Sequence, residues 1–207
     1  MKKLLIISFA VLFLNISSFS QGNIEFHFGP AIPLSDFVDD DLNDDDAGGA
    51  AVGINVGLKY LYPLTENGLG LFAGLDVFYN GLASDVKDDY EDFFVSEADI
   101  TYNKYFNIPI SAGLIYEYRA NEKVSLFCDF GFTTNFFKAT DFVVEVDNDD
   151  LTVETELAYS IGFKVGGGLL INNKTAIELN YYGLGQHDTE SEISNNMGDS
   201  ETVDFEQ

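Results

Sequence analysis

The two histidines, His27 and His187, are the side chains best suited to acid–base chemistry near neutral pH. His187 is followed by Asp188 and lies close to Ser191 along the chain. A serine, a histidine and a carboxylate can together transfer acyl groups, but only when their side chains are in hydrogen-bond contact. Neighbours in a loop do not define that geometry, so we assign no catalytic residues. We expect His27 to bond Glu25 or another carboxylate that faces it.

A set of charged residues recurs at positions that alternate with apolar residues. Its members are Glu25, Lys59, Asp76, Glu117, Asp129, Lys164 and Glu178. In a sheet these positions share one face with glycine, serine and asparagine, which predicts a polar network inside a narrow barrel. We expect the two lysines to pair there with Asp76, Asp129 or Glu178. A gated path for protons or ions along these groups is the alternative.

Clustered carboxylates are the other candidate chemistry. The densest cluster consists of Asp39, Asp40, Asp41, Asp44, Asp45 and Asp46. Such oxygen ligands suit weak binding of Ca²⁺ or Mg²⁺, although the ordered spacing of an EF-hand loop is missing. A solvated, disordered acidic surface is the competing interpretation. Nucleic acid is excluded as a partner because phosphate binding needs a basic patch and the formal net charge is −25.

The elements that must position these residues are strands. Residues 51–60 alternate strictly between apolar side chains and glycine, alanine, asparagine or lysine, and a period of two predicts a strand. The same pattern predicts seven strands, at 23–30, 51–61, 69–80, 105–118, 124–136, 157–171 and 175–185.

One face of every predicted strand is apolar and the other is small or charged. A soluble β-sandwich or a lipocalin-like barrel also alternates, but its solvent face is normally rich in lysine, glutamate and threonine rather than glycine. The tyrosines favour a membrane, since several lie near the strand ends, where the two aromatic belts of a membrane barrel are found. Cys128 lies on the apolar face, and we expect it to act as a small hydrophobic residue.

Connections of alternating length complete the pattern. Acidic segments at 32–49, 81–104, 137–156 and 186–202 follow the odd strands, and short turns follow the even ones. Long outer loops with short inner turns are typical of outer-membrane barrels. The sequence therefore predicts an all-β, eight-stranded, antiparallel, up-and-down transmembrane β-barrel. Its eighth strand is expected to begin at 202–206 and to be truncated at Gln207.

The N-terminus predicts export. Lys2 and Lys3 precede an apolar stretch at 4–14, and the Ser18–Phe19–Ser20 triplet fits a signal-peptidase site. We expect residues 1–20 to be a signal peptide and residues 21–207 to form an outer-membrane β-barrel domain. The apolar stretch is too short to span a membrane as a helix.

Three short runs carry a family resemblance: the signal ending in Ser20–Gln21, the strand opening at 69–74 and the run Tyr-Phe-Asn-Ile-Pro-Ile at 105–110. With them the chain resembles the Bacteroidetes-type outer membrane protein β-barrel domain, a porin-family group similar to the small OmpA, OmpX and OmpW barrels. The resemblance implies the fold and the location in the cell outer membrane. It transfers no catalytic residues.

These patterns predict a non-enzymatic protein of the cell surface, with a side-chain-filled lumen and extracellular acidic loops. The expected partners are outer-membrane lipid, lipopolysaccharide and divalent cations, and the expected state is a monomer without a cofactor. A narrow channel or a small-ligand-binding barrel, porin-like or lipocalin-like, is the alternative. A lipid A-modifying enzyme is the third hypothesis.

Overall fold

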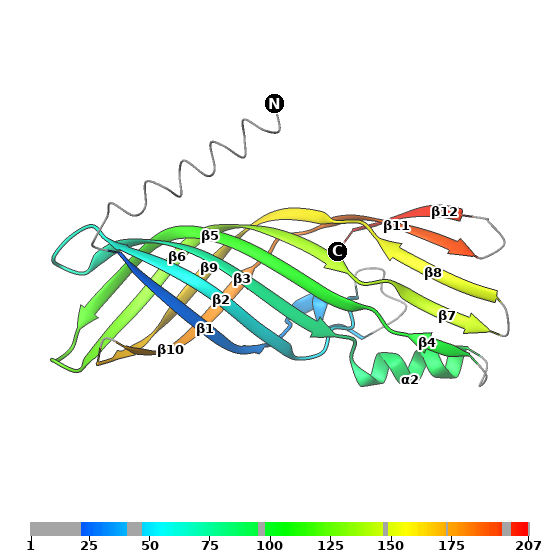
Figure 1. Ribbon diagram of the computed structural model, residues 1–207, viewed down its shortest axis with the longest axis horizontal. Helices are drawn as coiled ribbons and strands as arrows, with labels where there is room; N and C mark the ends of the chain where they lie inside the picture. Colours follow the sequence, from blue (N-terminus) through cyan, green and yellow to red (C-terminus); the bar gives the residue numbers. More distant parts are fainter. Residues whose placement is uncertain are drawn as a thin grey trace, which may run out of the picture.

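Two antiparallel sheets form the molecule, one curved like half of a barrel and one extending beyond its end (Figure 1). The computed structural model describes residues 22–40, 47–94, 98–146, 149–172, 174–195 and 200–206. The expected signal peptide at 1–20 lies outside the described residues. Among the described helices, none is long and apolar enough to cross a membrane.

The curved sheet has seven strands, in the order β1-β2-β3-β5-β6-β9-β10, and each strand is antiparallel to its neighbours. Its members are β1 (Asn23–Ala31), β2 (Gly53–Pro63), β3 (Leu69–Gly81), β5 (Lys104–Arg119), β6 (Val124–Ala139), β9 (Ala158–Ile171) and β10 (Thr175–Gly183). All seven strands predicted from the alternating pattern are confirmed, with ends that differ by a few residues. Nearest-neighbour pairing along the chain gives the predicted up-and-down order.

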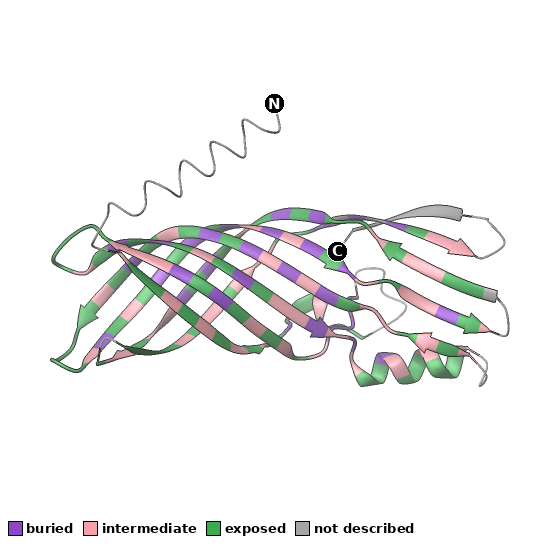
Figure 2. Ribbon diagram, viewed as in Figure 1, coloured by how far each residue is buried: buried purple, intermediate pink, exposed green. Residues whose placement is uncertain are grey.

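Burial in this sheet is inverted relative to that of a water-soluble protein. The charged Lys59 and Lys164 are only 1% and 2% exposed, whereas Phe26 and Phe28 on the outer face are 82% and 88% exposed. Figure 2 shows the resulting bands, in which exposed residues alternate with buried or half-buried residues along the strands. The alternation follows from the strand geometry, since successive side chains point to opposite faces.

Short turns join the strands at one end, as predicted. In the β2–β3 turn, Gly68 has a φ of +91°, a conformation that favours glycine. In the β9–β10 turn, Asn172 adopts a φ of +53°, which asparagine tolerates better than most residues. In the β5–β6 turn, the Asn121 Oδ1 atom accepts hydrogen bonds from the N–H groups of Lys123 and Val124, at 2.8 and 2.9 Å. These contacts fix the hairpin registers.

The described parts of the acidic connections at the other end contain further strands, where the sequence predicted long loops. They contain β4 (Asp99–Thr101), β7 (Phe142–Val146), β8 (Asp149–Thr155), β11 (Asp188–Asn195) and β12 (Ser200–Glu206), paired in the order β12-β11-β8-β7-β4. The physical reason is the supply of β-branched residues between the acids, such as Val143, Val144 and Val153, which favour strands. The 3₁₀ turn η1 (Ser35–Phe37) and helix α2 (Ser84–Phe93) complete this end.

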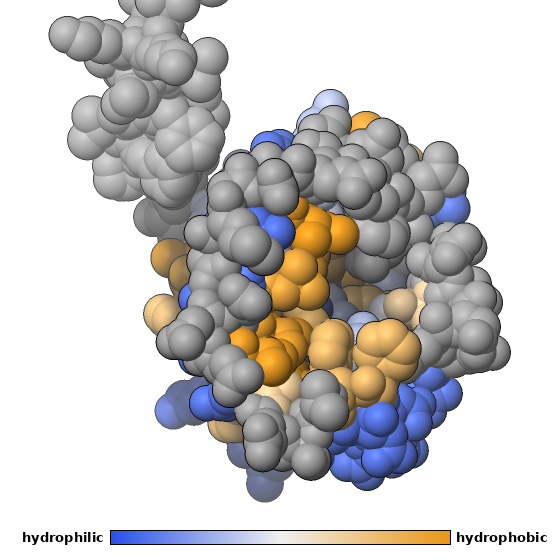
Figure 3. Space-filling model, turned by 90° about the vertical axis from the view of Figure 1, so that its right-hand side faces the viewer, coloured by the Kyte–Doolittle hydropathy of each residue, from blue (hydrophilic) through white to orange (hydrophobic). Residues whose placement is uncertain are grey.

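A small apolar cluster holds α2 against the rim of the seven-stranded sheet. Its buried members are Ala50, Leu82, Val86, Tyr105, Phe137 and Ala139. The Tyr105 hydroxyl donates a hydrogen bond of 2.7 Å to the carbonyl of Gly48, which ties the first connection to β5. Figure 3 looks onto this end of the molecule and shows a central hollow with hydrophobic side chains along its wall.

The position of the expected eighth strand differs from the prediction. Residues 202–206 belong to β12, which pairs with β11 in the second sheet and with neither β1 nor β10. The seven-stranded sheet therefore has two edge strands, β1 and β10, in the described part of the chain. Local alternation could not reveal this, because it predicts a strand without naming its partner.

Candidate functional site: the polar interior

Four charged side chains from four strands meet inside the curved sheet. The Lys59 Nζ atom of β2 donates to Glu178 Oε1 of β10 at 2.6 Å and to Asp129 Oδ2 of β6 at 3.3 Å. The Lys164 Nζ atom of β9 lies 3.4 Å from Glu178 Oε1 and 3.6 Å from Asp129 Oδ1. Two ammonium groups and two carboxylates thus form one buried, charge-balanced cluster, which we call the lysine cluster.

Aromatic rings complete the surroundings of both ammonium groups. Lys59 Nζ lies 5.2 Å from the centre of the Phe127 ring. Lys164 Nζ lies 5.2 Å from the centre of Phe72 and 5.6 Å from that of Tyr182. A cation over an aromatic face is stabilised further when water is excluded. The lysine cluster and these rings occupy the interior at this level, where Glu178 and Tyr182 also line a cleft.

A second cluster is centred on Asp76 of β3. Its Oδ1 atom contacts His27 Nε2 at 2.5 Å and accepts a hydrogen bond from Asn55 Nδ2 at 3.1 Å. Its Oδ2 atom accepts a hydrogen bond from the Tyr182 hydroxyl at 2.9 Å. Because His27 lies on β1 and Tyr182 on β10, Asp76 connects the two edge strands through the interior.

Glycines make room for these contacts at two positions. A Cβ atom on Gly57 would collide with the His27 ring and with Asp76 Oδ1. A Cβ atom on Gly166 would collide with Asn180 Oδ1 and Asp129 Oδ1. Small residues on the inner face are therefore a steric requirement of the two clusters.

The structure places the predicted network members at different depths. Lys59, Asp129, Lys164 and Glu178 form the lysine cluster, whereas Asp76 pairs with His27 instead of a lysine. Glu25 lies opposite Lys59 in the β1–β2 register and is half-buried. Glu117 is half-buried near the short turns.

The sequence did not predict a set of uncharged, hydrogen-bonded side chains near the end of the curved sheet that carries the acidic connections. His187, 7% exposed, contacts Asn135 Nδ2 and Ser160 Oγ with its Nε2 atom, each at 2.9 Å. Asn135 also donates a hydrogen bond of 2.6 Å to Asn107 Oδ1. Burial lowers the pKa of His187 below its usual value, so the ring is neutral at pH 7. The signal in the sequence was the presence of asparagine and serine on the inner face.

This arrangement differs from the acyl-transfer set that the sequence suggested for testing. The serine that contacts His187 is Ser160 of β9, and its hydroxyl also donates to the carbonyl of Leu184. Ser191 is buried within β11, where it pairs with Thr155 and Val203. In the described residues, His187 thus acts as a hydrogen-bonding partner of β6 and β9.

The acidic cluster of the first connection falls mostly outside the described residues. Asp39 and Asp40 follow η1, while Asp41, Asp44, Asp45 and Asp46 are not described. Within the described ranges, no three histidine, cysteine or acidic side chains are grouped as metal ligands. Weak Ca²⁺ or Mg²⁺ binding by this cluster stays a prediction.

Neither a protein-family model nor a curated protein matches this chain. The resemblance to the outer membrane protein β-barrel domain therefore stays a prediction. The inverted burial and the two interior clusters are the observations on which a function can be based.

Proposed function

We propose that this chain is an outer-membrane β-barrel protein whose curved sheet spans the membrane as part of an eight-stranded barrel. The observation that carries the proposal is the outer face of the curved sheet. Phe26, Phe28 and Leu179 are each more than four-fifths exposed there, and aliphatic side chains on the other strands continue the apolar surface. An apolar surface of this extent on a soluble monomer would be unfavourable, whereas lipid is its natural environment.

The interior supports a structural or surface-interaction role rather than free diffusion. The lysine cluster, Phe72 and Phe127 occupy the interior, and eight-stranded barrels are just wide enough to be filled by side chains. The protein has no catalytic role in this proposal. A narrow channel is the second candidate, because Glu117, Glu178 and His187 lie along one continuous cleft.

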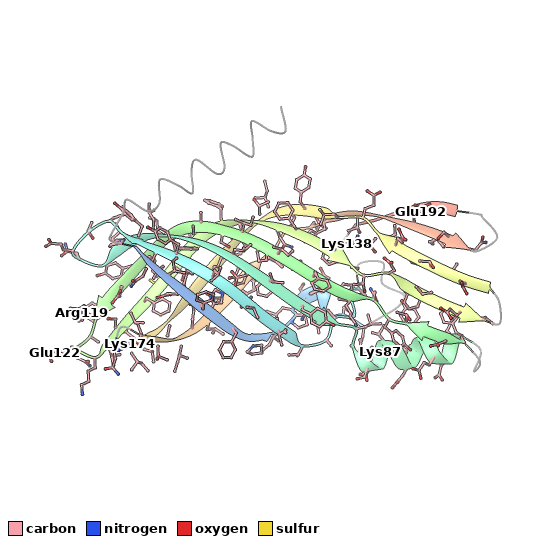
Figure 4. The ribbon with its side chains drawn as sticks, viewed as in Figure 1. Lys87, Arg119, Glu122, Lys138, Lys174 and Glu192 are labelled. Atoms are coloured by element: carbon pink, nitrogen blue, oxygen red, sulfur yellow. The ribbon has the colours of Figure 1, made fainter. Side chains whose placement is uncertain are left out.

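Charge along the molecule supports an orientation with the second sheet outside the cell. Arg119, Glu122 and Lys174 lie at the short-turn end, and Lys87, Lys138 and Glu192 lie toward the other end (Figure 4). The connections at that other end carry most of the 35 acidic residues. Divalent cations would connect this acidic surface to anionic lipopolysaccharide.

Density-gradient fractionation of the cell envelope tests the location. We expect the chain in the outer-membrane fraction and resistant to extraction with alkaline carbonate. Recovery from the soluble periplasm would overturn the proposal in favour of a lipocalin-like barrel.

Planar-bilayer recording tests the role. A filled lumen predicts no stepwise conductance from the purified protein. Steps that change in size in a Lys59→Ala variant would establish the narrow channel instead, because Lys59 lies in the middle of the interior.

A further inference from the structure

The seam between β1 and β10 is the least complete part of the seven-stranded sheet. β1 pairs only with β2, and β10 pairs only with β9, among the described strands. These two strands contain no buried residue, whereas each of the five strands between them contains at least two. The backbone N–H and C=O groups on the open side of each edge are left for another partner.

Strand direction determines what can close this seam. Neighbours alternate in direction across seven strands, so β1 and β10 run parallel to each other. One additional strand running the opposite way would be antiparallel to both edges. A single strand therefore completes the hydrogen bonding without a parallel pair.

The space along the seam is large and elongated. A cleft of about 1580 Å³ is lined by all of Asn23–Ala31 and by most of Thr175–Gly183. It reaches from Glu117 and Arg119 near the short turns to His187 at the other end. Small-molecule sites usually have volumes of roughly 300–1,000 Å³, so this cleft is better matched to a chain segment.

Polar groups in the cleft define the chemistry of the inward side of that segment. Glu25 on β1 and Glu178 on β10 both line it, and the Lys59 ammonium group is directed to Glu178 and Asp129. Two buried polar atoms, His27 Nδ1 on β1 and Asn180 Oδ1 on β10, have no hydrogen-bond partner among the described residues. A basic side chain would complement Glu25, which lies outside the charge-balanced lysine cluster, and its N–H groups suit the Asn180 oxygen.

The arrangement of the second sheet also favours a strand in the seam. β11 follows β10, and β12 runs back antiparallel to β11 on the side away from β8 (Figure 1). Glu206 of β12 lies opposite Asp188, five residues beyond the last residue of β10. β8 leads into β9 and β11 follows β10, so the paired strands β8 and β11 extend the paired strands β9 and β10. β12 lies on the other side of β11 and therefore in line with the seam. A strand in the seam would continue the direction of β12.

We propose that the seam binds one extended, amphipathic strand, antiparallel to β1 and β10. Its outward residues are apolar, and its inward residues are small except for a basic residue that faces Glu25 and Glu178. The apolar outward side rests on the proposed membrane location, whereas the backbone pairing does not. This is recognition by strand addition, in which main-chain hydrogen bonds supply affinity and alternate side chains supply specificity.

A synthetic peptide added to the full chain in detergent micelles tests the inference. The peptide has about eleven residues, the length of a barrel strand, and alternates leucine or valine with glycine or serine around one central lysine. A scrambled peptide of the same composition and a peptide with glutamate in place of the lysine are the controls. We expect the alternating lysine peptide to bind at least tenfold more tightly than either control.

Hydrogen exchange with and without the peptide locates the binding. Slower exchange confined to the amides of β1 and β10 is expected, with β5 and β6 unchanged. A Glu25→Gln variant should keep the binding but reduce the preference for lysine over glutamate, since Glu25 is in neither interior cluster. Binding of the scrambled peptide with equal affinity, or protection outside the seam, would overturn the inference.

Other occupants give different results. A dimer of the chain that excludes the peptide, or a lipid that protects the seam while the peptide does not bind, would also overturn it. Fractionation of the envelope needs no peptide, so failure of the proposed location and failure of the seam inference are distinguishable.

Discussion

The interior residues show how the inner side of the curved sheet holds several charges as partners of one another. In the lysine cluster, each ammonium group faces two carboxylates, so neither positive charge depends on a single ion pair. Buried pairs add little net stability, because desolvation offsets much of the attraction. Removal of one partner is different, since it leaves an uncompensated charge. The cluster therefore connects β2, β6, β9 and β10 at this level while adding little net stability.

Replacing Lys59 with methionine tests this balance. Lys59→Met leaves Asp129 and Glu178 with Lys164 alone, and we expect it to lower the free energy of unfolding by about 3–5 kcal/mol. Glu178→Gln added to the same variant should recover part of the loss, because it removes the surplus charge. Urea unfolding in lipid vesicles measures both. The matched control is Lys174→Met at an exposed turn. A change in unfolding free energy that is equally small in Lys59→Met and in this control would show that water screens the cluster.

His187 predicts a pH dependence. Its folded-state pKa is lowered by burial, so the unfolded chain binds the proton more readily. The contribution of the neutral ring to stability is complete above about pH 6.5, the usual histidine value, and is lost as the pH falls below it. We expect the difference in unfolding free energy between the native chain and His187→Gln to shrink between pH 7.5 and 5.5. A difference that stays constant over this range would contradict the prediction.

At the scale of elements, the alternating pattern predicted the positions of the seven strands of the curved sheet. It did not predict contacts that depend on which strands and side chains pair with one another. The range 124–136 was predicted for the strand observed at Val124–Ala139, because large apolar residues alternate there with glycine, threonine and asparagine. The β7–β8 hairpin and α2 were missed because the acidic segments that contain them were interpreted as loops, although β7 itself consists mainly of valine and phenylalanine. The pairing of Asp76 with His27 and Tyr182 depends on the curvature of the sheet, which no local pattern contains.

Helix α2 provides the element-scale prediction. It has ten residues, no side-chain hydrogen bond at its N-cap, and Val86 as its buried residue. Isolated helices of this length are marginal in water, so packing of Val86 in the apolar cluster must hold it. Val86→Ala should destabilise α2 by about 1.5 kcal/mol through the loss of two buried methyl groups.

Amide hydrogen exchange measures this effect locally. We expect faster exchange in α2 and no change in β6 and β9, which pair with each other over fourteen residue pairs from Val124↔Ile171 to Phe137↔Ala158. Asp89→Ala, at an exposed position of the same helix, is the control. Faster exchange throughout the curved sheet would show that α2 and the sheet open as one unit.

The whole molecule is polar inside, apolar around its middle and acidic at one end. Exposed apolar faces of this extent are unfavourable in water, which is the basis of the membrane environment that we propose. The second sheet and α2 lie beyond one end of the curved sheet, where the acidic connections gather. The orientation that we propose rests on the same asymmetry, since the short-turn end carries no second sheet in the described residues.

A charge on the outer face tests the membrane environment of the whole molecule. Leu75 lies at the middle of β3, opposite Leu58 and Ile110, and its side chain is on the outer face. Leu75→Arg should lower the free energy of unfolding from lipid vesicles by about 2–4 kcal/mol, the cost of arginine near the bilayer midplane. Leu64→Arg, in the exposed β2–β3 turn, should change it by less than about 1 kcal/mol, because the headgroup region and water solvate the charge. Far-UV circular dichroism during urea titration measures both variants, since the chain contains no tryptophan. Equal stability of the two variants, in a chain that stays folded without lipid, would place the outer face in water and overturn the membrane proposal.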